Sequence, residues 1–513
     1  MTKFKLFLLL FICTQVCVGQ QLVLTGTLLG AAKQDTVEMN ESYNGNYWKK
    51  NSVYLHPDAL GNFHLSYPCH TAKFVLLVYK ENRQWLLLSP GRPLHININA
   101  GRSRQMFSFS GKAKTENDLI QKLKLTDVLT LPFIKELKLK DSYAHWSVDS
   151  VISIKLPVIK HSLDSARQVV YQAGVPLNLK KIIAAELRYF YANAVSQNLG
   201  GLLNNAENRI GFNTHFIDTV LSDFTVPTED ELNISMNANL YLDSYFRFKL
   251  WKTIYVYGTD NNRGHADSLF ENNTGVTFKE LANDPDRNNE VYLFSTRLGG
   301  LLPRYAWEKH LTNLLSDFCM SGQLQSAAKL LNFIKAHCAS RQYITASEKM
   351  FAPLKKAREQ YAGNLNIKIR PDYRDISSLK MLLAPYKGKI VFIDMWGTWC
   401  PHCIEDMAFE PALKDRLKGR DIVFLYIASD EDKDDEVWRD FIFVNNLTGE
   451  HVRRTADQIA SLWNELGIAD SDQAYPHYFI FDRSGNIMVD NAKRPGDGDA
   501  LYFQLETALN KTP

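Results

Sequence analysis

The chain contains 513 residues, of which 45% are hydrophobic and 22% carry a charge. This length is too great for a single hydrophobic core, so we expect about three domains, and the apolar content allows each of them to bury a core. The formal net charge is only +3, and no block of lysines and arginines occurs. Both observations argue against a nucleic-acid partner.

Residues 1–19 have the pattern of a secretory signal peptide. Two lysines precede the apolar run Leu6–Ile12, and small residues stand before a cleavage position ahead of Gln20. The run is too short to cross a bilayer. We therefore expect cleavage and export to a periplasm. Attachment as a lipoprotein through Cys13 or Cys17 is the alternative, although the residues before both cysteines match a lipobox poorly.

Residues 20–111 are predicted to form an all-β domain. Short runs rich in β-branched and aromatic residues recur at spacings of roughly eight to twelve residues, with glycine, proline and asparagine between them. This pattern is typical of a β-sandwich or a small barrel. The expected strands are Leu22–Leu29, Thr36–Met39, Ser52–Leu55, Phe63–Tyr67, Phe74–Tyr79, Trp85–Leu88, Leu94–Ile98 and Met106–Phe109.

Residues 112–363 are predicted to form a helical domain, because apolar residues recur there with helical spacing. We find no repeat of fixed length, but the last two expected helices form a helical hairpin of tetratricopeptide type. The expected helices are Glu116–Lys124, Leu131–Lys138, Val148–Lys155, Leu163–Ala173, Leu177–Leu199, Phe278–Asn283, Tyr305–Phe318 and Gln323–His337.

Five cysteines remain after the predicted cleavage: Cys69, Cys319, Cys338, Cys400 and Cys403. Cys319 lies beside the turn of the predicted hairpin, and Cys338 lies at the far end of its second helix. At 1.5 Å of rise per residue they are roughly 20–25 Å apart. This separation excludes a disulfide between them, and we interpret both as buried structural thiols. Cys69, next to His70, is interpreted as a packed or turn residue.

Residues 364–513 are predicted to form an α/β domain. Four apolar runs are interpreted as strands, and the last two of them form a hairpin. Further helical segments separate the second strand from this hairpin. The expected strands are Ile390–Ile393, Ile422–Ala428, Tyr478–Asp482 and Ile487–Val489, and the expected helices are Asp375–Leu383, Ile404–Lys418, a segment through Trp438 and Phe441, Thr455–Leu466 and Leu501–Leu509.

The sequence WGTWCPHC, residues 396–403, directly follows the first of these strands. Cys400 is expected at a helix N-terminus, where free amides and the helix dipole favour a thiolate, the attacking species in disulfide exchange. Cys403, one turn further, can then release a mixed disulfide. A structural disulfide or half of a zinc site is the alternative. Zinc requires two more ligands at close spacing, and no second C-x-x-C occurs.

The order of strand with Asp394, two tryptophans, C-x-x-C and helix resembles the thioredoxin superfamily. The nearest resemblance is to TlpA/ResA-type thiol-disulfide oxidoreductases of bacterial envelopes, from about residue 366 to the C-terminus. It implies a thioredoxin-like fold in which Cys400 is a partly exposed nucleophile and Cys403 is more buried. The all-β segment is similar to the N-terminal domains found in envelope proteins of this type.

The resemblance also implies a substrate-binding surface beside the cysteines. Pro476 is implied to be the cis-proline that faces the C-x-x-C, and Tyr475 is implied to offer backbone groups to an incoming peptide. Trp396 and Trp399 are expected to flank the disulfide and, with Pro401, to shape the contact surface; plain packing is the alternative for both tryptophans. An ordinary trans proline at a strand start is the alternative for Pro476.

Two further residues are candidates for catalysis. Asp394 lies in an otherwise apolar strand, where burial would raise its pKa and let it accept a proton from Cys403; a lysine-paired structural role is the alternative. His402 would donate a hydrogen bond to the Cys400 thiolate or stabilise it by charge, which would make the disulfide more oxidising; a solvated, uninvolved histidine is the alternative. The Pro-His pair resembles the strongly oxidising Dsb-type oxidase, whereas its surroundings resemble the reductases, so the direction of electron flow stays open.

These observations predict an exported enzyme that reduces disulfides of envelope proteins. A membrane thiol donor is the expected electron source, because the sequence shows no nucleotide or flavin motif, and no cofactor or metal is expected. The alternatives are a disulfide oxidase or isomerase, or a binding protein with an incidental thioredoxin-like unit. A peroxiredoxin-like peroxidase is disfavoured because its lone cysteine would follow Thr and Pro, whereas Trp399 precedes Cys400 here.

Overall fold

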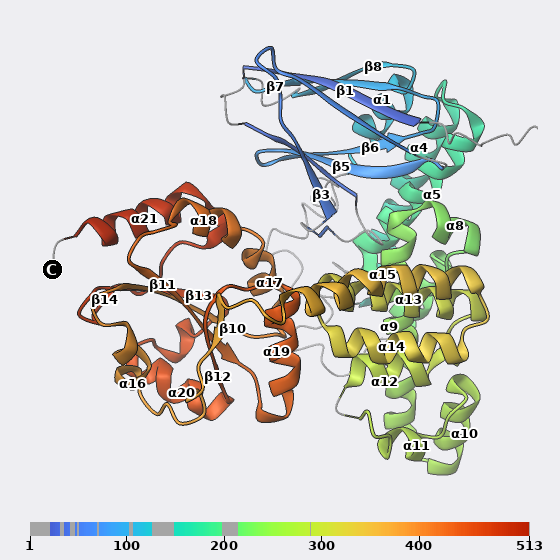
Figure 1. The fold of residues 1–513 in the computed structure, drawn as a ribbon. Coiled ribbons are helices and arrows are strands. Elements are labelled where there is room, and N and C mark those ends of the chain that lie inside the picture. The colour runs from blue at the N-terminus through green and yellow to red at the C-terminus, as the bar shows by residue number, and fades with distance from the viewer. Residues whose placement is uncertain are drawn as a thin grey trace, which may run out of the picture. The chain divides into compact units, whose positions relative to one another are not determined.

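A computed structural model describes residues 21–511 except 31–34, 42–46, 49–50, 69–70, 102–105, 126–147, 197–213 and 288. The predicted signal segment, the pair Cys69-His70 and the expected helix Leu131–Lys138 lie outside the described residues. The chain forms two compact units (Figure 1). The first comprises residues 1–47, 51–224 and 230–241, and the second comprises residues 48–50, 225–229 and 242–513.

The N-terminal part of the first unit is a β-sandwich, as predicted. One sheet has the strand order β4-β1-β7-β8, and the other has the order β3-β2-β5-β6. Leu24 and Ile96 from the first sheet share one buried core with Val37 and Leu77 from the second. Every expected strand forms: β1 (Gln21–Leu29), β2 (Val37–Asn40), β3 (Ser52–Leu55), β4 (Asn62–Pro68), β5 (Lys73–Tyr79), β6 (Asn82–Leu88), β7 (Leu94–Asn99) and β8 (Phe107–Gly111).

Helix α1 (Lys114–Leu123) packs against the sandwich. The buried Asn117 amide accepts from the backbone N–H of Leu87 at 2.9 Å and donates to the Leu87 carbonyl at 3.1 Å, so it satisfies two groups of strand β6. The helices that follow are α3 (Val148–Ser150), a π-helical segment (Val151–Lys155), α4 (Leu156–Gln172), α5 (Leu177–Ala194), α7 (Thr214–Asp223) and α8 (Glu229–Ile234).

The second unit begins with helices and includes the predicted hairpin, α13 and α14. Cys319 and Cys338 are free, as predicted. Cys319 is buried, but the prediction of a buried Cys338 was wrong, because this residue caps the end of its helix and is half-buried. Helices α9 and α15 were not predicted, because α9 has apolar residues all around it and α15 is mostly polar and contains Pro353. The helices are α9 (Met236–Thr259), α10 (Arg263–Thr274), α11 (Phe278–Ala282), α12 (Glu290–Arg297), α13 (Arg304–Met320), α14 (Leu324–His337) and α15 (Arg341–Tyr361).

The C-terminal part is an α/β domain built on a sheet of order β14-β13-β10-β11-β12-β9. Strand β10 (Ile390–Trp396) is central, parallel to β11 (Ile422–Ser429) and antiparallel to β13 (His477–Phe481). Its alternate residues enter two cores: Ile393 packs with α16, α19 and α20, and Phe392 packs with α18 and α21. The remaining strand of the predicted hairpin is β14 (Ile487–Val489).

Helices therefore cover both faces of this sheet, as expected for a thioredoxin-like fold (Figure 1). Each helix expected from the sequence is present, although the segment after Cys403 is divided into two helices. They are α16 (Leu379–Leu383), α17 (Pro401–Met407), α18 (Glu410–Arg416), α19 (Asp435–Val444), α20 (Ala456–Glu465) and α21 (Asp499–Asn510).

Two strands of the sheet were not predicted: β9 (Ile367–Ile369) and β12 (Gly449–Arg454). The sequence of β12 is charged, and helical material was expected in this region. The Arg453 side chain is nevertheless buried, because its guanidinium bonds the carboxylates of Asp432 and Asp435. Ion pairs made across the fold, rather than the local pattern, allow this polar segment to form a buried strand.

Candidate active site

Cys400 and Cys403 form a disulfide at the end of β10, where the chain enters α17. Cys400 is the N-cap residue of α17, and its Sγ accepts a hydrogen bond from the backbone N–H of Cys403 at 3.1 Å. Pro401 occupies the first helical position, where its missing N–H costs nothing. An N–H directed at Sγ favours the thiolate once the disulfide is reduced.

Both cysteines are buried in this bridged state. The exposed fraction is 3% for Cys400 and 0% for Cys403. The prediction that Cys400 is partly exposed was therefore wrong, whereas the prediction that Cys403 is the more buried of the two agrees with the structure. Both cysteines belong to the buried core cluster that also contains Trp396 and Met407.

The two tryptophans of the motif occupy different environments. Trp396 ends β10, is 0% exposed and packs against Phe441 with ring centroids 5.1 Å apart. Trp399 is 58% exposed, and its indole Nε1 donates to the Ser429 carbonyl at 2.7 Å. The prediction that both tryptophans form the contact surface was therefore wrong for Trp396, because a fully buried ring cannot touch a substrate. Trp399 is the one available for contact.

The peptide bond between Tyr475 and Pro476 is cis, as the resemblance implied. It directly precedes β13, which pairs with β10 so that His477 lies opposite Met395. The half-buried Tyr475 ring meets Trp399 edge to face at 5.2 Å. This contact brings the segment before β13 to the same end of the sheet as the C-x-x-C loop.

The His402 ring contacts Glu405 rather than the sulfur atoms among the described contacts. Its side chain is 70% exposed, and its Nδ1 lies 3.2 Å from a carboxylate oxygen of Glu405. No hydrogen bond joins its ring to Cys400 among the contacts of the described residues. The predicted stabilisation of the Cys400 thiolate by a direct bond from His402 is therefore absent from this geometry, and Glu405 would offset the charge of a protonated ring.

Asp394 is the central member of a polar row across three strands. The β-sheet register sets it opposite Tyr426 of β11 on one side and Tyr478 of β13 on the other. Asp394 is 1% exposed, and neither carboxylate oxygen has a hydrogen-bond partner among the described residues. Burial raises the pKa of the Asp394 carboxyl well above its usual range, and the nearby carboxylates of Glu410 and Asp406 raise it further.

The two flanking tyrosines bind the acidic residues of the neighbouring helices. The Tyr478 hydroxyl donates to Asp406 at 2.9 Å, and Arg494 Nε donates to the same carboxylate at 2.6 Å. The Tyr426 hydroxyl donates to Glu410, whose second contact is Lys414 at 2.9 Å. The predicted alternative, a direct lysine partner for Asp394, does not form; Lys414 pairs with Glu410 instead. Asp406, Glu410 and Lys414 were missed because only the fold brings them to Asp394.

A fourth residue that was missed supports the active-site loop. Asp430 follows β11, is 5% exposed and accepts hydrogen bonds from the backbone N–H and the hydroxyl of Thr398. Thr398 lies two residues before Cys400. A signal was available in the sequence, because a carboxylate directly after a buried parallel strand lies at the edge where the neighbouring strand ends.

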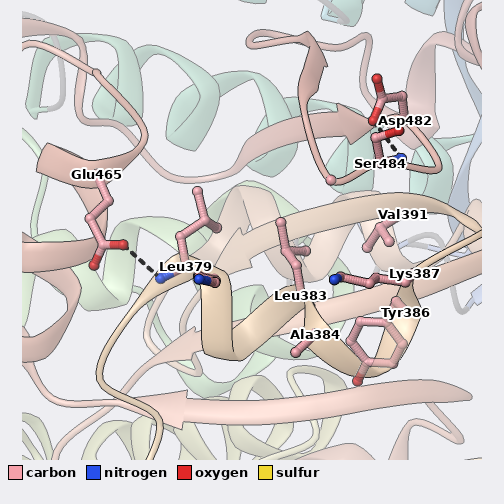
Figure 2. A pocket seen from close by; sticks show the side chains of 11 residues that line it. Leu379, Leu383, Ala384, Tyr386, Lys387, Val391, Glu465, Asp482 and Ser484 are labelled. Carbon is pink, nitrogen blue, oxygen red and sulfur yellow. Dashed lines mark hydrogen bonds between the residues drawn. The ribbon is translucent and has the colours of Figure 1, made fainter.

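A pocket lies at the other end of β10 (Figure 2). Val391 in its wall is near the start of β10, whereas Cys400 lies four residues beyond the last residue of this strand, Trp396, so roughly 17 Å of strand separates the pocket from the active-site loop. Glu465 accepts a hydrogen bond from the Leu379 N–H there at 2.8 Å. The pocket is therefore apart from the disulfide. It is lined by Leu379, Lys380, Leu383, Ala384, Tyr386, Lys387, Val391, Glu465, Asp482, Ser484 and Gly485.

A serine, a histidine and an aspartate are connected in the helical part as in a hydrolase. His310 Nδ1 lies 2.8 Å from Asp243, and its Nε2 lies 3.0 Å from the Ser295 hydroxyl. Ser295 is only 3% exposed, so a substrate has no access to its oxygen. We assign these three hydrogen-bonded residues a structural role, because they connect helices α9, α12 and α13.

The described residues contain neither a candidate metal site nor a helix that could span a membrane. No cluster of three or more His, Cys, Asp or Glu side chains with the spacing of a metal site occurs among them. None of the helices that the structure describes combines the length and the apolar character needed to cross a membrane.

Comparison with known proteins places the similarity in this domain. Residues 371–497 match the Redoxin family. A thiol-disulfide oxidoreductase ResA of Bacillus cereus is 33% identical over 137 residues, which cover 27% of this chain and 71% of the relative. A ResA protein of Bacillus thuringiensis is 26% identical over the same length, with the same coverage. A solved structure of a putative thiol-disulfide oxidoreductase from Bacteroides vulgatus is 28% identical, with a TM-score of 0.21, and its match covers 25% of this chain and 83% of that chain.

Proposed function

Because this chain belongs to the thioredoxin superfamily and is a thiol-disulfide oxidoreductase of TlpA/ResA type, we propose that it is exported and reduces disulfides of envelope proteins through its Cys-Pro-His-Cys dithiol. The observation that carries the proposal is the Cys400–Cys403 disulfide at the start of α17. Its sulfur atoms lie where backbone N–H groups favour a thiolate. No other cysteine of the described residues is bridged.

The reaction moves two electrons from the dithiol to the substrate. The Cys400 thiolate attacks a substrate disulfide, forms a mixed disulfide and releases one substrate thiolate, which takes up a proton. The Cys403 thiol then loses its proton and attacks Cys400 Sγ. This step releases the second substrate sulfur as a thiolate and leaves the Cys400–Cys403 disulfide. For an enzyme that reduces its substrates, the thiols of a membrane donor protein then reduce the Cys400–Cys403 disulfide and restore the dithiol.

Asp394 is the base that we propose for the second step. Its carboxylate has no hydrogen-bond partner among the described residues, so both oxygens can accept a proton. Its raised pKa makes it a stronger base than an exposed aspartate. It lies on the strand that leads into the Cys400 loop, and Cys403 and Met395 of that strand share one core cluster.

Trp399, Pro401, Tyr475 and the cis bond before Pro476 form the substrate-binding surface in this proposal. The exposed indole of Trp399 offers an apolar contact, and Tyr475 supports it edge to face. The backbone at Tyr475 precedes strand β13, so it can pair with an extended peptide.

The surroundings of His402 favour reduction over oxidation. A strongly oxidising disulfide requires extra stabilisation of the Cys400 thiolate. Here the His402 ring is 70% exposed and is paired with Glu405. Solvent and the carboxylate both weaken its effect on the sulfur. This observation supports the reductase and disfavours the oxidase alternative that the Pro-His pair suggested.

Export rests on the signal-like residues 1–19. We retain the domain bounds 20–111, 112–363 and 364–513 as part of the proposal. The all-β and helical domains would select or position the disulfide-bearing proteins on which the third domain acts.

The test uses the mature protein and a fluorescent peptide that carries one intramolecular disulfide. Cys400→Ser is expected to abolish turnover, and Cys403→Ser is expected to accumulate a mixed disulfide that is visible by mass spectrometry. Cys338→Ser is the matched control and should keep wild-type turnover, because this thiol is free and half-buried. Turnover that persists in Cys400→Ser would overturn the proposed function. A reduction potential near −120 mV, rather than about −270 mV or lower, would reverse the direction of electron flow.

A further inference from the structure

The last residue of β11, Ser429, and the residue after it, Asp430, hold the loop that leads to Cys400. Ser429 accepts a hydrogen bond through its carbonyl from the indole of Trp399 at 2.7 Å. The Asp430 carboxylate accepts from the Thr398 N–H, with its two oxygens at 3.2 and 3.3 Å, and from the Thr398 hydroxyl at 2.6 Å. Consecutive residues of the loop are thus attached to consecutive residues of the neighbouring strand end.

The sheet makes this attachment possible. Strands β10 and β11 are parallel, and their register sets Trp396 opposite Ala428, so the segments that follow leave the same edge side by side. Gly397 lets the loop close. A Cβ atom built on Gly397 would lie 2.5 Å from the Trp399 indole nitrogen, so the indole lies directly against this glycine.

Asp430 is a buried carboxyl group whose charged neighbours shift its pKa in opposite directions. It is 5% exposed, and burial raises its pKa to about 6, against the lowering effect of its bonds from Thr398. Asp434 faces it and raises the pKa further, whereas the Arg453 guanidinium lowers it. Arg453 also donates to the Asp430 carbonyl at 2.8 Å, but its charge is shared with Asp432 and Asp435. The carboxyl therefore changes charge close to neutral pH.

We propose that Asp430 is a positioning residue whose carboxylate fixes Thr398, and with it the exposed Trp399 beside the disulfide, so that substrate capture weakens when this carboxylate takes up a proton. The inference deepens the proposed function and rests on it. Hydrogen bonds to an ionised carboxylate are about twice as strong as neutral ones. Protonation also removes acceptor capacity from a group that receives three bonds from Thr398.

The test measures substrate capture separately from the chemistry. The reduced full chain is mixed with the fluorescent disulfide peptide in single turnovers between pH 5 and pH 7.5. The half-saturating peptide concentration is expected to rise about fivefold at pH 5 in the wild type, because charge-assisted bonds become neutral ones. The maximal rate depends on the Cys400 thiolate and is fitted separately.

Four variants decide the assignment. Asp430→Asn should give a raised half-saturating concentration that no longer changes with pH. Thr398→Val, which loses only the hydroxyl, should lose a large part of the pH effect, and Thr398→Ser should restore it. Glu436→Gln is the matched control, because this exposed carboxylate of α19 contacts neither Thr398 nor Arg453 among the described residues, and it should follow the wild type. Asp430→Asn with the wild-type profile would overturn the proposal; if this variant does not fold, a wild-type profile in Thr398→Val would do the same.

A second readout does not depend on activity. The fluorescence of Trp399, taken as the difference between the wild type and Trp399→Phe, should change with a midpoint near pH 6 and should not change in the Asp430→Asn background. Failure of the function itself is recognised separately, by turnover that persists in Cys400→Ser. If Cys400→Ser loses turnover but the half-saturating peptide concentration of the wild type does not change with pH, the proposed function stands and only the role of Asp430 is refuted.

Discussion

The second unit contains two pairs of cysteines in contrasting positions. Cys400 is as buried as Cys319, with exposed fractions of 3% and 6%. Cys400 begins a helix and receives a backbone N–H, whereas Cys319 lies near the end of α13 and Cys338 caps the end of α14. Burial alone therefore does not separate a redox cysteine from a structural one; the position along the helix does.

The chemical consequence follows from the direction of the helix. A helix N-terminus favours a negative sulfur, whereas a C-terminus presents carbonyl groups that disfavour it. Burial raises the pKa of Cys319 and of Cys338 to about 12. These two thiols should be inert under conditions in which Cys400 reacts.

The largest expected effect is a difference in alkylation. After reduction, iodoacetamide at pH 7 should label Cys400 at least about 10³ times faster than Cys319 or Cys338, because raising a thiol pKa from 9 to about 12 lowers its thiolate fraction by that factor. Mass spectrometry of the peptides measures the rates. Denatured protein is the control, in which all of these thiols should react alike. Labelling of Cys338 within tenfold of Cys400 would break the comparison.

The next effect concerns the proton of Cys403. Asp394→Asn is expected to slow release of the mixed disulfide about 10²-fold, because general-base assistance is lost, while the first attack by Cys400 stays within about twofold. Rapid chemical quenching separates the two steps. In the wild type, release should accelerate as pH rises through the raised pKa of Asp394, since the carboxylate is the active form. A normal release rate in Asp394→Asn would assign the base elsewhere.

The stability of the same variant supplies an independent check. Folding raises the pKa of Asp394, so the folded state binds its proton more tightly than the unfolded state does. The contribution of this group to stability is therefore full below the unfolded pKa and is lost as pH rises through the folded pKa. Asp394→Asn should consequently gain stability over the wild type as pH increases. The urea midpoints of the variant and the wild type at several pH values measure this gain in stability. A gain that becomes smaller as pH increases would contradict the burial of an unpaired carboxyl group.

The structural thiols should show the opposite pattern, with an effect on stability and none on turnover. Cys319→Ala removes one buried sulfur atom from the hairpin, which should lower the free energy of unfolding by about 1 kcal/mol. Urea unfolding followed by circular dichroism measures the change. Peptide reduction should remain at the wild-type rate. Lost turnover in a folded Cys319→Ala protein would show that the helical region takes part in the chemistry.

The features that were predicted correctly are local in sequence. The C-x-x-C after a buried strand, the proline before β13 and the alternating runs of the sandwich each carry their signal within a few residues. Asp430 and Glu410 were missed because their importance comes from side chains that the fold brings to them. Strand β12 was missed because the charge of its buried Arg453 is neutralised by Asp432 and Asp435, which the local pattern does not reveal. Trp396 and Trp399 carry the same local signal, and only packing distinguishes them.

The smallest expected effect decides the direction of electron flow. Glu405→Gln frees His402 from its carboxylate partner, so a protonated ring can act on the Cys400 thiolate without compensation. Because an exposed ion pair contributes at most about 1 kcal/mol, the reduction potential should rise by only about 10–20 mV. Glutathione buffers and tryptophan fluorescence measure it, with His402→Gln as the control that should not rise. A rise above about 100 mV would mean that Glu405 alone keeps the potential of the Cys400–Cys403 pair in the reducing range. The difference between the redox cysteines and the structural cysteines would then depend on a surface charge rather than on helix position.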